Sequence, residues 1–267
     1  MGSLANYAEN ALLGHIFGTA YSAPASIYIA LSTADPLDDA SGLTEPGDTY
    51  ARQTIAFLAA ASRAVVQDAE VIFPEAAASW GTITHWALFD AASGGNMLAH
   101  GSFLSSFDVL AGNSTTIGSG EVQVSINASA GAGFTDYLAH ALLDLMFNGV
   151  ALSQPDTYVA LANATISDAA TSITEVTGTG YSRVLTNKAG QAAPAWSAVA
   201  SGAVDNADAI DWSVGAGDWL QIVAMALMDA TTAGNVLAYD NANIVDQTPA
   251  NGDTVKFDVG ALNVSLS

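Results

Sequence analysis

The chain has 267 residues, no cysteine and a formal net charge of −21, from 26 acidic and 5 basic side chains. Without cysteine there can be no disulfide bond, thiolate metal site or thiol nucleophile. Nucleic acids and anionic membranes are bound through clustered Lys and Arg, so neither is expected as a partner. The hydrophobic fraction of 51% indicates a folded protein, and no apolar run approaches the roughly 20 residues that span a bilayer, so a soluble protein is expected.

The N-terminal residues predict one amphipathic helix. Ser3 is the expected N-cap, apolar residues recur at helical spacing from Leu4 to Leu12, and Gly18 is expected to end the helix. The chain begins without the basic and apolar segments of a signal peptide.

From residue 26 onward, short apolar segments alternate with clusters of turn residues, which is typical of β-structure. In strand 82–89 we expect Ile83, His85, Ala87 and Phe89 on one face, and the turn that follows it predicts a hairpin. The expected strands of this half are 26–32, 52–58, 70–73, 82–89, 96–101 and 121–126.

The same order of elements then returns. Residues 128–133 are small and predict a short linker. A second helix is expected, capped by Thr135 or Asp136 and ended by Asn148-Gly149. Strands are then expected at 157–162, 221–228 and 261–266.

The chain therefore contains one module twice. Tyr28-Ile29-Ala30-Leu31 matches Tyr158-Val159-Ala160-Leu161, and Gly95-Asn96-Met97-Leu98-Ala99 matches Gly234-Asn235-Val236-Leu237-Ala238. We expect a mainly β protein of two tandem homologous β-sandwich domains, jelly-roll-like, each with one N-terminal α-helix. The expected domains are 1–127 and 134–267, with an insertion of about eight residues between 184 and 218 of the second repeat.

Residues retained in both repeats are candidates for structural roles. We expect each retained arginine to hydrogen-bond a retained acid of its own repeat, and each retained tryptophan to anchor the core. The retained set is Glu45, Arg52, Trp80 and Asp90 in the first repeat and Glu175, Arg183, Trp219 and Asp229 in the second.

No catalytic residue, metal ligand or cofactor site is expected. There is no nucleophile elbow, and Gly131-Ala132-Gly133 lacks the third glycine of a dinucleotide loop. The acidic segments 35–39 and 205–211 could bind Ca²⁺, but solvated loops are the preferred interpretation. The histidines lack the spacing of a metal-binding pair, and each is present in only one repeat, so none is assigned to the shared fold. They are His15, His85, His100 and His140.

Several motifs of the first repeat resemble a family of small tailed-bacteriophage virion proteins. They are Tyr28 to Pro36, Thr44-Glu45-Pro46, Tyr50-Ala51-Arg52, Phe73 to Ala76, Ser79 to Trp86, Phe89-Asp90-Ala91 and Gly95-Asn96. Members are often labelled tail-fibre-like, and some are capsid decoration or cement proteins. The second repeat departs from the pattern, with Asp218-Trp219-Leu220-Gln221 in place of Ser79-Trp80-Gly81-Thr82.

The resemblance implies a non-enzymatic virion structural protein made in the host cytoplasm. The preferred interpretation is a capsid decoration or cement protein on the outer surface of the head, with the major capsid protein and further copies of itself as partners. One alternative is a tail-fibre, baseplate or neck component. Another is a carbohydrate-binding module, which an exposed Trp196 in the insertion would favour. An enzyme is the least favoured class.

Overall fold

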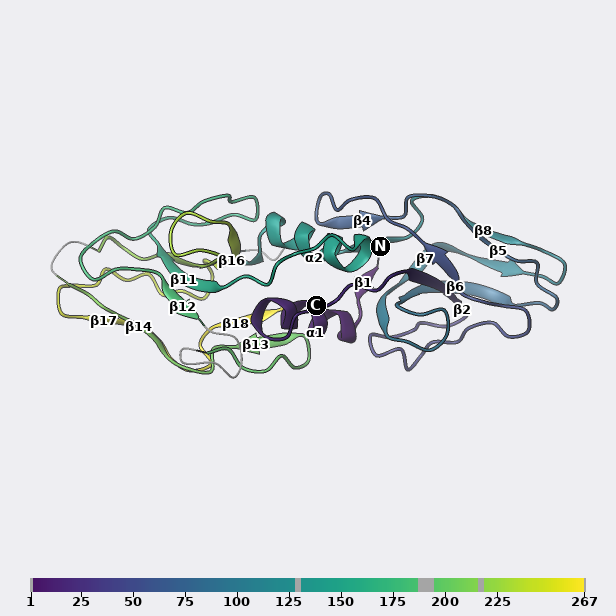
Figure 1. Ribbon diagram of the computed structural model, residues 1–267, viewed down its shortest axis with the longest axis horizontal. Coiled ribbons are helices and arrows are strands. Elements are labelled where there is room, and N and C mark those ends of the chain that lie inside the picture. Colours follow the sequence, from purple (N-terminus) through teal and green to yellow (C-terminus); the bar gives the residue numbers. More distant parts are fainter. Residues whose placement is uncertain (1, 128–130, 187–194, 216–218, 267) are drawn as a thin grey trace.

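The structure is a computed structural model that describes residues 2–127, 131–186, 195–215 and 219–266. The molecule is elongated, with β-structure of the first repeat at one end and of the second repeat at the other (Figure 1). Both helices lie in the middle, as do β1 (Ser3–Leu4) and β18 (Asn263–Ser265). The expected mainly β class with two tandem copies of one fold is confirmed.

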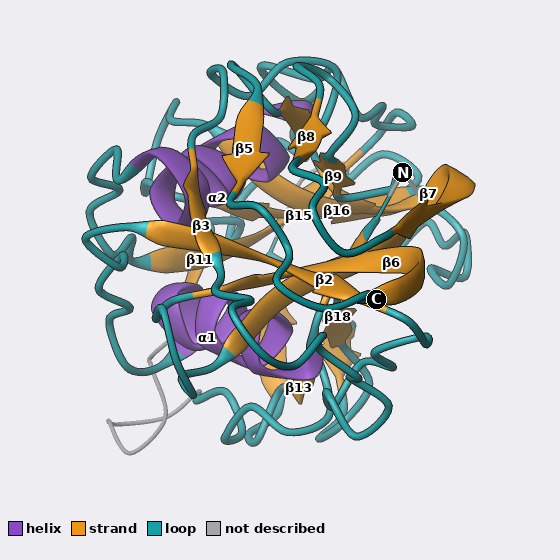
Figure 2. Cartoon of the chain, turned by 90° about the vertical axis from the view of Figure 1, so that its right-hand side faces the viewer, coloured by secondary structure: helices purple, strands orange, loops and turns teal. Residues whose placement is uncertain are grey.

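The first repeat contains an antiparallel five-stranded sheet in the order β1-β7-β6-β2-β3. Two short ribbons, β4 with β9 and β5 with β8, contribute to the same hydrophobic core and form the second layer of a sandwich (Figure 2). The remaining strands are β2 (Ile27–Ser32), β3 (Gln53–Ile55), β4 (Ala64–Val66), β5 (Val71–Phe73), β6 (Gly81–Phe89), β7 (Met97–Val109), β8 (Thr115–Ile117) and β9 (Gln123–Ser125).

The second repeat has the same topology. Its main sheet has the order β10-β16-β15-β11-β12, and its ribbons are β13 with β18 and β14 with β17. The strands are β10 (Ala132–Phe134), β11 (Thr157–Ala162), β12 (Val184–Thr186), β13 (Ala203–Asp205), β14 (Ile210–Ser213), β15 (Ala224–Met228), β16 (Val236–Asp240) and β17 (Thr254–Phe257).

The first helix, α1 (Asn6–Phe17), begins later than expected. Ser3 is not its N-cap, because Ser3 and Leu4 pair with β7; the cap position is Ala5, whose side chain offers no hydrogen bond. Gly18 ends the helix as expected.

The second helix, α2 (Asp136–Asn148), follows the expected pattern more closely. The Thr135 hydroxyl accepts from the Leu138 N–H, and Gly149 ends the helix in the left-handed conformation. Part of the expected linker is strand instead, since β10 pairs with β16.

The expected single face of β6 is wrong at Ile83. The register with β7 shifts between Ile83 and His85, and a β-bulge of this kind reverses the alternation of side chains. Ile83 therefore packs in the large core with Trp86, whereas Ala87 and Phe89 lie in a small cluster on the opposite face.

One hydrophobic core runs through both repeats. It includes Leu12 and Phe17 of α1, Leu142 and Phe147 of α2, and sheet and ribbon residues from both ends of the molecule. Because both helices contribute to the same core, the two repeats are packed together rather than strung on a linker.

Candidate functional site: the junction between the repeats

Each retained arginine contacts a retained acid of its own repeat, and in both repeats this acid is the glutamate rather than the aspartate. Arg52 donates from Nε to Glu45 Oε1 at 2.9 Å and from Nη2 to Oε2 at 2.8 Å, with its guanidinium 3.5 Å from the centre of the Phe89 ring. Its Nη1 donates to the carbonyls of Ala91 and Gly94, which belong to the β6–β7 turn. Arg52 therefore fixes this turn to the loop that carries Glu45.

Arg183 makes the matching contacts in the second repeat. It donates to both carboxylate oxygens of Glu175 at 2.9 Å and to the carbonyls of Ala230 and Ala233. Both copies keep this bidentate pair, with its arginine buried, although their sequences have diverged, so we assign it to the maintenance of the shared fold.

The retained aspartates are not partners of these arginines. Asp90 instead accepts from the backbone N–H and the side-chain amide of Asn96, both at 2.7 Å. Asp229 accepts in the same way from Asn235. The glycine before each asparagine has a positive φ, and a side chain on Gly95 would collide with the Asp90 carboxylate, which explains why this glycine recurs.

The retained tryptophans both lie in the core. Trp80 meets the Tyr50 ring edge-on with 5.3 Å between centroids, and Trp219 meets Tyr181 in the same way at 5.5 Å. The structure therefore places all eight retained residues within the two β-sandwiches and does not gather them into one pocket.

The helices meet the opposite repeat through a pair of equivalent hydrogen bonds. The N–H of Gly202 in the second repeat donates to Asn10 Oδ1 of α1 at 3.0 Å. The N–H of Arg63 in the first repeat donates to His140 Nε2 of α2 at 2.8 Å. Asn10 and His140 occupy the same place in their helices, so the histidine shares a structural role although its residue type does not recur.

Aromatic side chains repeat this crossed arrangement. Phe17 of α1 contacts Trp196 of the second repeat with 4.7 Å between ring centroids. Phe147 of α2 contacts Phe57 of the first repeat at 5.3 Å. The two repeats thus meet about an approximate twofold axis, as the subunits of a symmetric dimer do.

Trp196 is not exposed, as support for a carbohydrate-binding module would require. Its side chain is 2% exposed because it packs against Phe17 at the junction. The eight additional residues of the second repeat fall between Thr186 and Trp196, mainly outside the described residues. The support that Trp196 gave to a carbohydrate-binding module is therefore removed.

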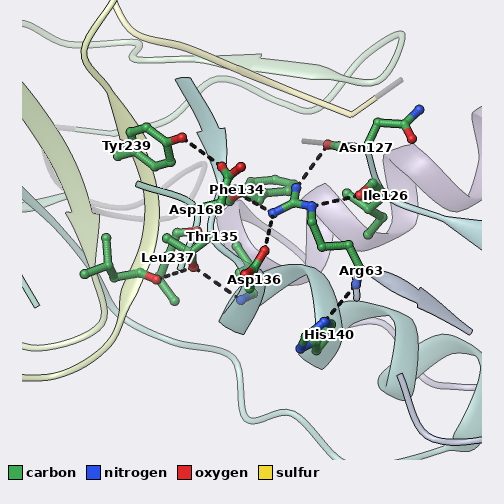
Figure 3. Close-up of polar contacts among 12 residues, drawn as sticks. Arg63, Ile126, Asn127, Phe134, Thr135, Asp136, His140, Asp168, Leu237 and Tyr239 are labelled. Atoms are coloured by element: carbon green, nitrogen blue, oxygen red, sulfur yellow. Dashed lines mark hydrogen bonds and ion pairs between the residues drawn. The ribbon is translucent and has the colours of Figure 1, made fainter. Parts of the chain in front are cut away.

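Arg63 breaks the symmetry of the junction (Figure 3). Its Nη1 donates to the Phe134 carbonyl at 2.9 Å and to Asp136 Oδ1 at 3.2 Å, while Nε and Nη2 donate to the carbonyls of Ile126 and Asn127, both at 3.0 Å. One side chain thus joins the end of the first repeat to the start of the second.

Gly202 takes the place of Arg63 in the second repeat, and both residues have a positive φ. Next to Gly202 lies the buried carboxylate of Glu9 from α1. Burial raises the pKa of Glu9 to about 6, and the negative charge of Asp38 adds to this effect. Arg63 does not recur, because Gly202 takes its place, so a comparison of recurring residues does not find it. The alignment of an arginine with a glycine is the sign in the sequence that Arg63 has a role in the first repeat only.

The other histidines and the acidic loops have structural partners. His100 Nε2 lies 2.8 Å from Asp38 Oδ1, and in the equivalent place Tyr239 donates to Asp168. His85 Nδ1 lies 2.8 Å from Thr84 Oγ1, and His15 Nε2 lies 2.9 Å from the Leu152 carbonyl.

Acidic side chains of both segments accept hydrogen bonds from backbone N–H groups, which lie in local turns in segment 35–39 and join two separate stretches of chain at Asp208. Asp35 accepts from Leu37, Asp39 from Ser41, and Asp208 from Ala195. Among the described residues, no three His, Asp or Glu side chains gather as metal ligands would. No helix in the described part of the chain has the length and apolar character required to cross a membrane.

Comparison with known proteins gives one result that covers nearly the whole chain. The model of the family described as podophage GP4 fiber I protein gp80 matches twice, at residues 3–125 and 133–265. No curated protein matches the chain. The chain belongs to this family of tailed-phage virion proteins and carries the family's module in tandem.

Proposed function

We propose that the chain is a non-enzymatic structural subunit of a podophage virion fibre. The observation that carries this proposal is the double match to a fibre-protein family, one match for each repeat. The crossed junction supports it, because it makes one chain into a fused pair of modules with a common core. Such a unit has the properties of a stiff, elongated building block (Figure 1).

The sequence resemblance favours capsid decoration, with the major capsid protein as partner. The family description names a fibre, so we prefer the fibre role and keep capsid decoration as the alternative. Further copies of the chain are the partners that a repeating fibre requires. The net charge of −21 favours solubility of the free subunit before assembly on the virion surface.

The copy number in purified particles tests this proposal. Quantitative mass spectrometry of virions should find a few to a few dozen copies, and gold-labelled antibodies should mark fibres rather than the head. Hundreds of copies spread over the head would reject the fibre role and support capsid decoration. An enzymatic activity of this protein, measured in correctly assembled particles, would argue for an enzymatic role.

A further inference from the structure

A cavity of about 510 Å³ lies in the second repeat between β10 and β18. Its walls include Ala132 and Phe134 of β10, Leu227 of β15, Tyr239 of β16, Trp196 and Leu262. Ligand sites commonly have volumes of roughly 300–1,000 Å³, so the cavity is large enough to take an occupant.

The first repeat closes the equivalent place with hydrogen bonds. The Gly2 N–H donates to the Gln123 carbonyl at 2.8 Å, and the Ser125 N–H donates to the Gly2 carbonyl at 3.3 Å. These bonds form a parallel bridge between Gly2, next to β1, and Val124 of β9. The main sheet of the first repeat is thereby joined to its β4–β9 ribbon.

The described part of the second repeat does not contain this closure. Ala132 takes the place of Gly2, and Asn263 and Ser265 take the places of Gln123 and Ser125. No hydrogen bond joins β10 to β18 among the described residues. The backbone N–H and C=O groups of successive residues point to opposite sides of a strand. The Asn263 carbonyl and the Ser265 N–H therefore face away from β13 and toward the cavity.

The core residue behind the bridge also differs. In the first repeat the indole of Trp86 fills this space, and it leaves no room for a side chain on Gly2 or Gly101. In the second repeat Met225 occupies the position of Trp86, since each pairs with the equivalent leucine of the neighbouring strand. Ala132 and Asp240 replace the two glycines. The place of the indole is thus left as a cavity.

An unfilled cavity and two facing strand edges are both unfavourable features of a free β-protein. Cavities lose dispersion contacts, and open edges invite pairing with another chain. The equivalent depression in the first repeat is smaller, at about 340 Å³, and is lined by small and polar residues such as Gly2, Gly101 and Ser125. Of these two cavities, only the one in the second repeat is lined by large apolar side chains such as Phe134, Trp196 and Leu227.

We infer that the cavity is a slot for an extended peptide segment of another virion protein. The segment adds as a strand between β10 and β18 and places an aromatic side chain where the first repeat holds Trp86. Strand addition of this type takes affinity from main-chain hydrogen bonds and specificity from side-chain pockets. Asp240 lies on the wall, and none of the described residues that line the cavity is Lys or Arg, so the segment carries basic residues beside its aromatic one. Only the identity of the partner as a virion protein rests on the proposed function.

A fluorescein-labelled peptide, Lys-Val-Trp-Val-Lys with blocked ends, tests this inference on the full-length protein. Fluorescence anisotropy should show saturable binding below about 1 mM, the weak end of specific affinities. When the peptide is titrated into the protein, the NMR amide resonances of Ala132, Phe134 and Ser265 should shift. A peptide with Glu in place of both Lys residues should bind at least tenfold more weakly.

Three variants locate the binding. Ser265→Pro removes the N–H that faces the cavity and leaves the β13 ladder intact, so affinity should fall at least tenfold, whereas Ser265→Ala keeps that N–H and should bind like the wild type. The triple variant Ala132→Gly, Met225→Trp, Asp240→Gly rebuilds the closure of the first repeat and should abolish binding. Thermal unfolding verifies that each variant folds.

Three results would overturn the inference: no saturable binding by the wild type, equal affinity in Ser265→Pro and Ser265→Ala, or shifts confined to residues away from β10 and β18. Saturable binding of a neutral saccharide at these strands, without peptide binding, would also overturn it. None of these results bears on the fibre proposal, which copy counting tests separately.

Discussion

Asn10 accepts a 3.0 Å hydrogen bond from the backbone N–H of Gly202, a residue of the other repeat. Its counterpart joins His140 to the N–H of Arg63. Each helix therefore stabilises a turn in the opposite half of the molecule. A junction of this kind gives a tandem repeat the internal structure of a dimer, in which neither half is complete alone.

Loss of either bond should destabilise the whole chain by a similar amount. Asn10→Ala and His140→Ala each leave a backbone N–H without its partner, which costs about 1–3 kcal/mol. Urea unfolding measures both, with exposed Asn251→Ala as a control that should change stability by less than about 0.5 kcal/mol. A neutral result for both junction variants would contradict the crossed arrangement.

Removal of the Arg63 side chain should have a larger effect. Arg63→Gly retains the positive φ and loses four side-chain hydrogen bonds, so we expect a loss of about 2–4 kcal/mol. Arg63→Ala should cost about 1 kcal/mol more, because alanine is strained in this conformation. If the two variants were as stable as the wild type, Arg63 would not join the repeats.

Gly202→Ala tests the second half of the junction. An added Cβ would lie 2.7 Å from the Leu266 carbonyl oxygen and 2.8 Å from Glu9 Oε2. We expect a loss of about 2–4 kcal/mol from overlap and backbone strain together. Gly112→Ala is the matched control, since Gly112 also has a positive φ but open space around it, and it should cost about 1 kcal/mol.

Stability should fall as the pH rises through the titration of Glu9. Its pKa in the folded protein is about 6, above the ordinary glutamate value of 4.5. The folded state therefore binds more protons in this interval, and the free energy of unfolding decreases from about pH 4.5 to pH 6 by at most about 2 kcal/mol. Glu9→Gln should remove this part of the pH dependence; an unchanged slope between pH 4.5 and 6 would show that Glu9 is not its source.

The recurring arginines should be equally sensitive in the two repeats. Lysine cannot reproduce the bidentate contact with glutamate together with the bonds to the turn. Arg52→Lys and Arg183→Lys should each lower the free energy of unfolding by about 1–3 kcal/mol. Two very different values would contradict an equivalent role.

The sequence predicts strands well where apolar segments are bounded by turn residues. Strand β11 has the expected bounds, and β2 begins one residue later than expected. The three-residue strands β4 and β13 are too short to show a period, and they are recognisable only through their pairing with β9 and β18. The Ser3 cap fails because tertiary pairing with β7 overrides local helix preference.

The junction could not be predicted from recurrence alone. Asn10 and His140 differ in residue type but each accepts one backbone N–H, so matching residue types hides their common role. Trp196 and Phe57 are likewise equivalent once the insertion is placed before Trp196. No other residue type can make the bidentate contacts of Arg52 and Arg183. The arginine is therefore kept in both repeats, and a comparison of the repeats identifies it.

The crossed helices make the two repeats one cooperative unit. Differential scanning calorimetry of the intact chain tests it most directly. We expect a single transition whose calorimetric and van't Hoff enthalpies agree, at about 0.7 kcal/mol per residue near 60 °C. Two transitions, or a van't Hoff enthalpy near half the calorimetric value, would mean that the repeats unfold independently and would contradict the claim.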